Sequence, residues 1–244
     1  MAPRGALFAM LSLLAAEVAA GSGCARPAGG EEPAPDESRE RQAMVREQLE
    51  SRGIRDGRVL EAMRSVPRHR FVSKALRPVA YADMPLPIGR GQTISQPYVV
   101  AYMVETLQLR GGERVLEVGS GSGYAAAVLS RIAAEVYGIE LEPELYERSL
   151  STLRELGYAN VQLRCGDGFQ GWPEKAPFDA IVLSCSAESV PGPLWSQLKE
   201  GGRLVYPKGG AGWAQELVVV TKTPQGPSER VLVPVRFVPM RRAD

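Results

Sequence analysis

The chain has 244 residues, enough for one α/β domain of ordinary size and an extension, and 44% of them are hydrophobic, which supports a packed core. Lysine and arginine (29) nearly balance aspartate and glutamate (28), so the composition lacks the positive excess typical of a nucleic-acid-binding domain. Three cysteines and one histidine, without metal-ligand spacing, argue against a metal site.

The amino end has the pattern of an export signal. Its apolar run, Ala6–Ala16, has signal-peptide length and is too short to span a membrane, and Val18–Ala20 offers a cleavage site. Cys24 also permits lipoprotein processing. We expect residues 1–24 to be a signal peptide or lipoprotein signal, which would make the protein periplasmic or lipid-anchored. A charge close to the run, Glu17, leaves open a retained segment and a cytoplasmic protein.

The region that follows is expected to be a linker and then helices. Residues 25–40, rich in Pro and acidic residues, are typical of a disordered linker. Apolar residues at helical spacing predict helices over 39–49 and 54–65. Two prolines and two glycines indicate turns over 85–91. A proline suited to a first helical turn then begins a helix over 97–107.

Strands alternate with helices over most of the remaining chain, and residues 41–244 are expected to form one domain. The expected strands are 114–119, 135–140, 161–165, 178–184, 203–207, 215–222 and 231–238, and the expected helices are 122–132, 143–156 and 191–199. This order predicts a Rossmann-like, doubly wound α/β fold with a mostly parallel seven-stranded sheet, an N-terminal helical extension and a β-rich C-terminal end. A ligand should lie beyond the carboxyl ends of its strands.

The sequence RVLEVGSGSGY, residues 114–124, combines a predicted strand with a glycine-rich turn and the start of a helix. An acid that ends the next strand, Glu140, follows the glycines by about 20 residues, where a carboxylate can accept both ribose hydroxyls. Asp167 ends the strand after that. Each acid alone could instead be a turn residue or helix cap.

The glycine spacing differs from that of dinucleotide sites, which use GxGxxG. Here an acid precedes GxGxG, a pattern that resembles motif I of the class I S-adenosylmethionine (SAM) methyltransferases. SAM has a positive sulfonium and no phosphate, so an acidic site suits it. The resemblance implies these cofactor-binding residues: Glu117, Gly119, Ser120, Gly121, Gly123, Glu140, Leu141, Asp167 and Gly168.

Upstream, Met84–Gly89 and Gly91–Tyr98 resemble the signature of the protein-L-isoaspartate O-methyltransferases, and the similarity extends from about Met44 to Met240. This resemblance implies transfer of the SAM methyl group to the free α-carboxylate of L-isoaspartyl residues in damaged proteins (a protein-L-isoaspartate(D-aspartate) O-methyltransferase). The ester then collapses to a succinimide. By the same resemblance Ser95 is the active-site serine, and Thr93 and Ile94 line its pocket.

The predicted reaction needs few protein groups. A carboxylate acceptor is already ionised near neutral pH, so it needs no general base. Ser95 can orient this carboxylate by donating one hydrogen bond, worth roughly 1.5–3 kcal/mol to a charged acceptor. Ser95 could also be a helix cap alone. The expected partners are isoaspartyl proteins or peptides, with no nucleic acid, and the protein is expected to be a monomer.

Two segments depart from the family pattern. Residues 183–191 stand where the family has a small, Ala-rich loop, so Cys185 or Glu188 could change the fit of the acceptor. Arg90 stands where the family often has His, and could attract an acidic substrate or be a solvated charge. The altered loop keeps open a methyltransferase for another carboxylate or small molecule, and the export signal keeps open a SAM-binding envelope protein without turnover.

Overall fold

The computed structural model describes residues 36–210 and 214–243. The expected signal over residues 1–24 and most of the expected linker, 25–40, lie outside the described residues. The last residues of that linker are helical, because α1 begins at Glu37 rather than at residue 39. The Asp36 carboxylate caps this helix by accepting hydrogen bonds from the backbone N–H groups of Ser38 and Arg39, both at 3.1 Å.

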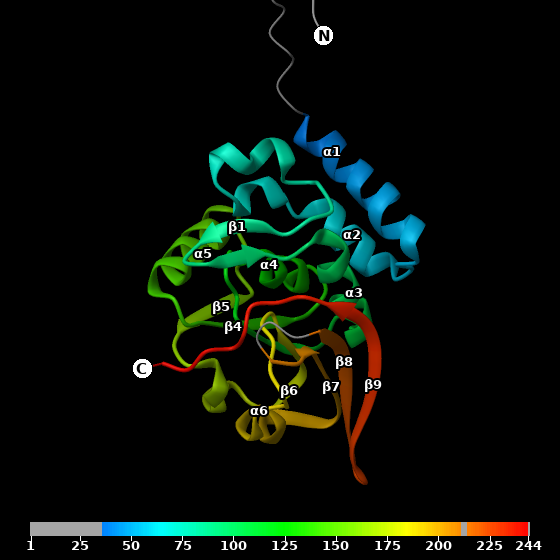
Figure 1. Cartoon of the computed structure of the whole chain (residues 1–244), viewed down its shortest axis with the longest axis vertical. Coiled ribbons are helices and arrows are strands. Elements are labelled where there is room, and N and C mark those ends of the chain that lie inside the picture. The colour runs from blue at the N-terminus through cyan, green and yellow to red at the C-terminus, as the bar shows by residue number, and fades with distance from the viewer. Residues whose placement is uncertain (1–35, 211–213, 244) are drawn as a thin grey trace, which may run out of the picture. The chain divides into compact units, whose positions relative to one another are not determined.

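A seven-stranded sheet forms the centre of the fold (Figure 1), with the strand order β5-β4-β3-β6-β7-β8-β9. The strands are β3 (Arg114–Val118), β4 (Glu135–Glu140), β5 (Val161–Cys165), β6 (Phe178–Leu183), β7 (Leu198–Lys208), β8 (Gln215–Thr223) and β9 (Gly226–Val235). The first five pair in parallel, and β7, β8 and β9 pair antiparallel. This confirms the predicted mostly parallel, seven-stranded sheet and its β-rich C-terminal end, whose strands β8 and β9 pair antiparallel.

Helices cover both faces of the sheet, as a doubly wound fold requires. They are α1 (Glu37–Met44, continued by helical turns to Arg52), α2 (Gly57–Ser65), α3 (Pro97–Leu107), α4 (Tyr124–Ser130), α5 (Pro143–Glu155) and α6 (Gly192–Gln197). Successive strand residues point to opposite faces. In β3, Val115 packs with the cluster that includes α2 to α5, whereas Leu116 packs with the cluster that includes α6.

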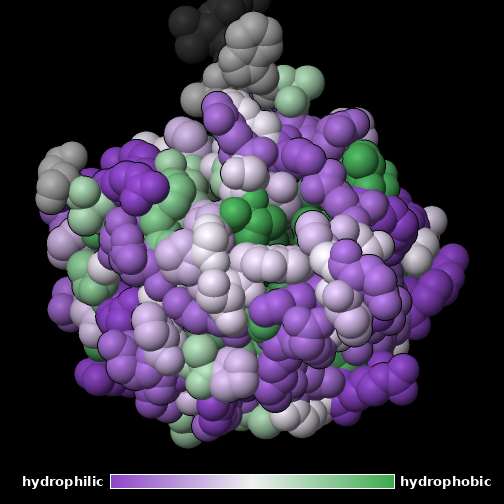
Figure 2. All heavy atoms as spheres, turned by 90° about the horizontal axis from the view of Figure 1, so that it is seen from below, coloured by the Kyte–Doolittle hydropathy of each residue, from purple (hydrophilic) through white to green (hydrophobic). Residues whose placement is uncertain are grey.

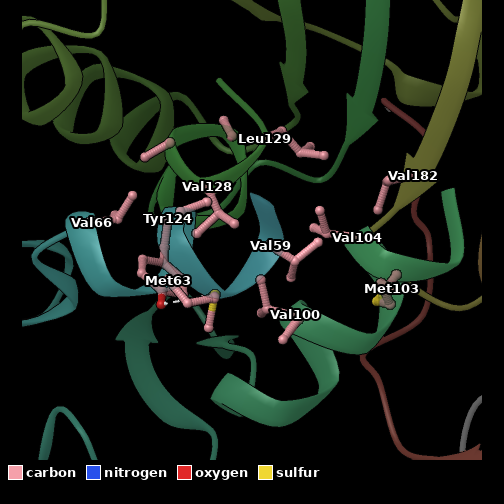
Figure 3. Close-up of a cluster of buried hydrophobic side chains, with 14 of the residues drawn as sticks. Val59, Met63, Val66, Val100, Met103, Val104, Tyr124, Val128, Leu129 and Val182 are labelled. Atoms are coloured by element: carbon pink, nitrogen blue, oxygen red, sulfur yellow. Dashed lines mark hydrogen bonds between the residues drawn. The ribbon is translucent and has the colours of Figure 1, made fainter. Parts of the chain in front are cut away.

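The N-terminal helices join the core through α2, α3 and α4 (Figure 3). Val59 and Met63 of α2, Val104 of α3 and Val128 of α4 are all at most 2% exposed and pack together. The Tyr124 hydroxyl at the start of α4 donates to the Met63 sulfur at 3.7 Å. The predicted helical extension is therefore part of the same core and supports the turn that precedes α4.

The largest differences from the sequence-based prediction lie in three places. The expected turn region 85–91 contains the first strand of a hairpin, β1 (Leu86–Gly89) paired with β2 (Gln92–Ile94), and positive φ angles over 89–91 close it. β7 begins at Leu198 and bulges where it passes Gly201, so the expected helix-to-strand turn lies within a strand. β9 ends at Val235, and residues 236–238, expected to be strand, leave the sheet.

Candidate active site

The glycine turn after β3 lies at the carboxyl edge of the sheet, next to β4. The backbone N–H groups of Gly119 and Ser120 both donate to the Ile139 carbonyl, at 2.8 and 3.1 Å. Gly119 has a φ of 82°, which only glycine adopts without strain. Gly123, also at positive φ, is the N-cap of α4 and packs under α5, so it shapes the turn rather than lining the cavity beside it.

Glu140, at the end of β4, is fixed against this turn. Its Oε2 accepts from the Gly121 backbone N–H at 2.6 Å and its Oε1 from the Glu142 N–H at 2.9 Å. The residue is 6% exposed. Because a carboxylate has about four acceptor positions, each oxygen can still receive a hydrogen bond from a ligand hydroxyl.

The third predicted acid, Asp167, follows β5. Its Oδ1 accepts from the Phe169 backbone N–H at 2.9 Å and caps the short helical turn Gly168–Gln170. Its neighbours Gly166 and Gly168 line the cavity, and Asp167 itself does not. A Cβ at Gly168 would lie 2.4 Å from Val118 Cγ1, so a side chain there would collide with β3. The acid therefore holds the shape of the cavity wall.

A cavity with a volume of about 560 Å³, including its part that is open to solvent, lies at the edge where the strand ends meet. Its lining residues are Gln92, Thr93, Val118, Gly119, Gly121, Ile139, Glu140, Leu141, Gly166, Gly168, Ser184, Cys185, Val238, Pro239, Met240 and Arg241. We call it the cofactor pocket. It includes Gly119, Gly121, Glu140, Leu141 and Gly168 of the predicted set. Sequence reasoning missed the contribution of residues 238–241, which were expected to be strand or tail.

A second cavity, of about 710 Å³, lies beside the cofactor pocket. Its lining residues are Pro85, Thr93, Ser95, Gln96, Val99, Ser184, Pro234, Val235, Arg236, Phe237 and Val238. We call it the acceptor pocket. A small inner pocket between the two contains the predicted Thr93, Ile94 and Ser95 together with Glu117 and Ser120. Thr93 and Ser184 line all three cavities, so they stand where the cofactor and acceptor pockets meet.

The segment that carries Ser95 is held by Asp83. The Asp83 carboxylate accepts from the Gln96 side-chain amide at 2.7 Å and from the Tyr98 backbone N–H at 3.2 Å. Arg52 forms an ion pair with Asp83 and lies over the Tyr98 ring, 3.6 Å from its centroid. Gln96 is the N-cap residue of α3, although its side chain makes no capping bond. Arg52 and Asp83 therefore support the residues next to Ser95.

The C-terminal residues cross the two pockets. The Ser186 backbone N–H donates to the Val238 carbonyl, and the Met240 N–H donates to the Ser186 carbonyl, both at 2.8 Å. Arg241 pairs with Glu142 at the start of α5. Among the described residues that line the cofactor pocket, Arg241 is the one cation, and its charge is neutralised by this pair.

The structure places the residues that depart from the family pattern at different distances from the pockets. Cys185 lines the cofactor pocket, and its sulfur lies 3.6 Å from where a Gly119 Cβ would be. Glu188 is exposed and lines neither the cofactor pocket nor the acceptor pocket. Arg90 is paired with Glu144 of α5, so its charge is directed to a surface acid.

Glu117, the acid inside β3, is 1% exposed. Its Oε1 accepts from the Ser184 hydroxyl at 2.8 Å, and its Oε2 has no partner among the described residues. Burial, together with the smaller effect of the nearby Glu140 charge, raises the pKa of this carboxyl to about 7, although the Ser184 hydrogen bond lowers it.

The chemistry of the pockets fits a positively charged nucleoside ligand. The acids Glu117 and Glu140 disfavour a pyrophosphate, and the one arginine is already paired with Glu142, whereas a sulfonium and an ammonium group suit the acids. The unpartnered Glu117 oxygen and the side-chain-free wall at Gly168 leave charge and space for such a group. Within residues 36–210 and 214–243, no cluster of His, Cys, Asp and Glu is placed to hold a metal ion.

Comparison with known proteins places these features in one family. The family model for protein-L-isoaspartate(D-aspartate) O-methyltransferase (PCMT) matches residues 39–244. The chain is 65% identical over 236 residues to protein-L-isoaspartate O-methyltransferase 2 of Anaeromyxobacter sp. (strain Fw109-5), covering 97% of both chains. It is 57% identical over 203 residues to the protein-L-isoaspartate O-methyltransferase of Opitutus terrae, covering 83% of this chain and 87% of that one.

Solved structures agree with the sequence relatives. A protein-L-isoaspartate O-methyltransferase structure superposes with a TM-score of 0.76 at 31% identity, covering 82% of this chain and 65% of that one. A Plasmodium falciparum structure, described as a protein-L-isoaspartate O-methyltransferase in complex with S-adenosyl-L-homocysteine, has a TM-score of 0.73 at 28% identity. It covers 83% of this chain and 99% of that one.

Proposed function

Because this chain belongs to the protein-L-isoaspartate(D-aspartate) O-methyltransferase family, we propose that its two pockets transfer a methyl group from SAM to the free α-carboxylate of an L-isoaspartyl residue. The protein is a SAM-dependent protein-L-isoaspartate O-methyltransferase, and damaged proteins or peptides that carry isoaspartyl residues are its substrates. The observation that carries the assignment of the site is that Thr93 and Ser184 line both the cofactor pocket and the acceptor pocket.

The residues proposed to hold SAM are those at the carboxyl edge of the sheet. Glu140 is placed to accept hydrogen bonds from the ribose hydroxyls, and Leu141 and Gly168 form the wall beside the nucleoside. Gly119, Ser120 and Gly121 present backbone, and Glu117 presents its unpartnered carboxylate oxygen. Asp167 and Gly123 act indirectly, by fixing the turns that carry their neighbours.

When bound, SAM supplies an electrophilic methyl group on its sulfonium. The protein's part is to present the acceptor carboxylate in line and free of water. Ser95 is proposed to donate a hydrogen bond to one carboxylate oxygen, leaving the other free to react, and Thr93 and Ile94 to enclose it. No proton has to be removed, because the acceptor is ionised near neutral pH. This explains why the described pockets contain no histidine.

The test is a methylation assay on an isoaspartyl peptide, read as methanol released by mild base, with the variant Ser95→Ala. Loss of one hydrogen bond to a charged acceptor should lower kcat/KM by roughly tenfold to a hundredfold while leaving the Kd for SAM unchanged. The matched control is Ser196→Ala, an exposed serine on α6 outside the three pockets. Full turnover by Ser95→Ala would refute the positioning role.

We also propose that residues 1–24 direct export, with cleavage near Ala20 or lipidation at Cys24, and that the mature protein is a monomer. The proposal of export rests on the apolar run at residues 6–16 and on the small residues that follow it near the possible cleavage sites. No helix among the residues that the structure describes is long and apolar enough to cross a membrane. Cell fractionation with the variant Cys24→Ala separates the two routes, and a cytoplasmic full-length chain would refute both. Light scattering tests the monomer.

A further inference from the structure

The Glu117 carboxylate is buried on β3, but only one of its two oxygens accepts a hydrogen bond within the described structure. Ser184, the residue that follows β6, donates to one of its oxygens, and the other oxygen has no partner among the described residues. A buried, unpaired carboxylate oxygen is costly unless something else supplies a positive charge or a donor. Ser184 is itself fixed, because its backbone N–H donates to the Val118 carbonyl at 2.9 Å.

No cationic side chain faces Glu117 in the described structure, and the Ala126 backbone N–H of α4, which lowers the pKa of its carboxyl, carries no formal charge and meets no hydrogen-bond geometry with Oε2. The titratable side chains nearest to it, from β4, α4 and the segment after β6, are Glu140, Tyr124 and Cys185. Glu140 adds negative charge, and Tyr124 and Cys185 are buried groups whose pKa values are raised to about 12 by burial, so they are neutral. The inner pocket in front of Glu117 therefore has a negative potential.

We propose that Ser184 is a positioning residue for cofactor binding, whose hydroxyl holds one oxygen of Glu117 so that the other receives the positive charge of SAM. This inference rests on the proposed function, because it takes SAM as the ligand of the pocket. Ser184 lies at the meeting point of the cofactor and acceptor pockets, but it acts through Glu117 and therefore on the cofactor side.

The proposal has a pH dependence whose sign follows from the contacts. A positive ligand binds better to ionised Glu117, and burial holds the pKa of that carboxyl at about 7, so the affinity for SAM should rise as pH rises through about 7. The Ser184 hydrogen bond lowers this pKa. Removing the hydroxyl should therefore raise the pKa and move the rise in affinity to higher pH.

The experiment measures the Kd for SAM by calorimetry without any acceptor, over a pH range centred on about 7, for Ser184→Ala and Ser184→Thr. At neutral pH we expect Ser184→Ala to bind SAM about tenfold more weakly, as for one lost hydrogen bond to a charged group. Its pH midpoint should move upward and its KM for an isoaspartyl peptide should stay within about twofold of wild type. Ser184→Thr, which keeps the hydroxyl, should restore both affinity and midpoint. Ser196→Ala is the matched control.

A folded Ser184→Ala that keeps the wild-type Kd and midpoint would overturn the proposal, and so would a raised peptide KM with an unchanged Kd. If Ser184→Ala does not fold, Glu117→Gln decides, because it must weaken binding and remove the pH dependence together. Glu117→Gln with the wild-type pH dependence would also overturn the proposal. Since the Kd for SAM and its pH midpoint are measured without acceptor, they stand even if the isoaspartyl assay fails, and the two failures are distinguishable.

Discussion

A residue proposed to bind SAM can lower the stability of the folded protein, and Glu117 is the main example. Burial raises its pKa from 4.5 to about 7, so the folded protein holds a proton there more tightly than the unfolded chain does. The stability that this proton contributes is present at low pH and is lost as pH rises through about 7.

Glu117→Gln, which cannot ionise, should therefore be more stable than wild type above pH 7, by at most about 3 kcal/mol, with the difference vanishing only below about pH 4.5, the pKa of the unfolded carboxyl. Thermal or urea unfolding across this range measures it. The control is Glu200→Gln, an exposed change whose effect should not vary with pH. A Glu117→Gln protein that is destabilised equally at all pH values would show that the buried carboxyl is not strained by ionisation.

Gly168 tests whether the shape of the cofactor pocket matters separately from its charge. A Cβ here would lie 2.4 Å from Val118 Cγ1 and 3.3 Å from Met240 Cε, so Gly168→Ala should cost about 1–3 kcal/mol and weaken SAM binding. Gly192→Ala is the matched control, because nothing lies within 4 Å of its Cβ position. Equal melting temperatures and SAM affinities for the two variants would contradict the close packing seen at Gly168.

At the scale of elements, the segment over 92–98 depends on contacts outside itself. Asp83→Ala removes the acceptor for the Gln96 amide and the Tyr98 N–H and leaves Arg52 without its pair. We expect kcat/KM for an isoaspartyl peptide to fall at least tenfold, because small displacements of Ser95 are costly, while the Kd for SAM stays unchanged.

Asp36→Ala provides the matched control, since it also removes an aspartate that accepts backbone N–H groups at a helix start. It should cost about 1 kcal/mol of stability without changing the kinetics. If Asp83→Ala weakened SAM binding and acceptor binding equally, the contacts of Asp83 would stabilise the domain as a whole and would not position Ser95 in particular.

The central strands could be predicted from sequence because each is a short apolar run bounded by turn residues. β4 and β5 have the predicted limits, and the acids that follow them meet at one edge because parallel strands end there. The β1–β2 hairpin could not be predicted, since β1 contains a proline and a glycine and β2 has only three residues. The start of β9 was predicted too late because residues 226–230, which lack apolar strand-forming side chains, also pair with β8.

The predicted site was incomplete for a related reason. Glu117 and Ser184 are 67 positions apart, and Arg52 and Asp83 are 31 apart, so no local pattern joins either pair. Residues 238–241 line the cofactor pocket only because the chain turns back across the sheet edge after β9. Local sequence identified the turns and acids at the carboxyl edge of the sheet, whereas the contacts that support them depend on the tertiary fold.

At the scale of the whole molecule, one face of the surface is largely polar. Figure 2 shows one face on which hydrophilic side chains predominate and apolar ones form small separate groups. Among the described residues, the large hydrophobic side chains that are well exposed are Val79, Met84 and Val231. Met84 adjoins Pro85 of the acceptor pocket, whose other lining residues are mostly apolar or uncharged. Such a surface can admit many polypeptides, so selectivity has to come from the isoaspartyl linkage itself.

The central claim is tested most directly by the ratio of kcat/KM for two peptides of one sequence, one with an isoaspartyl linkage and one with a normal aspartyl linkage. Methyl transfer from SAM is followed by mass spectrometry. The free α-carboxylate exists only in the first peptide at the damaged position, so the account predicts methylation of that peptide and none above background for the other. Equal methylation of both peptides, or SAM binding without methylation of either, would contradict it.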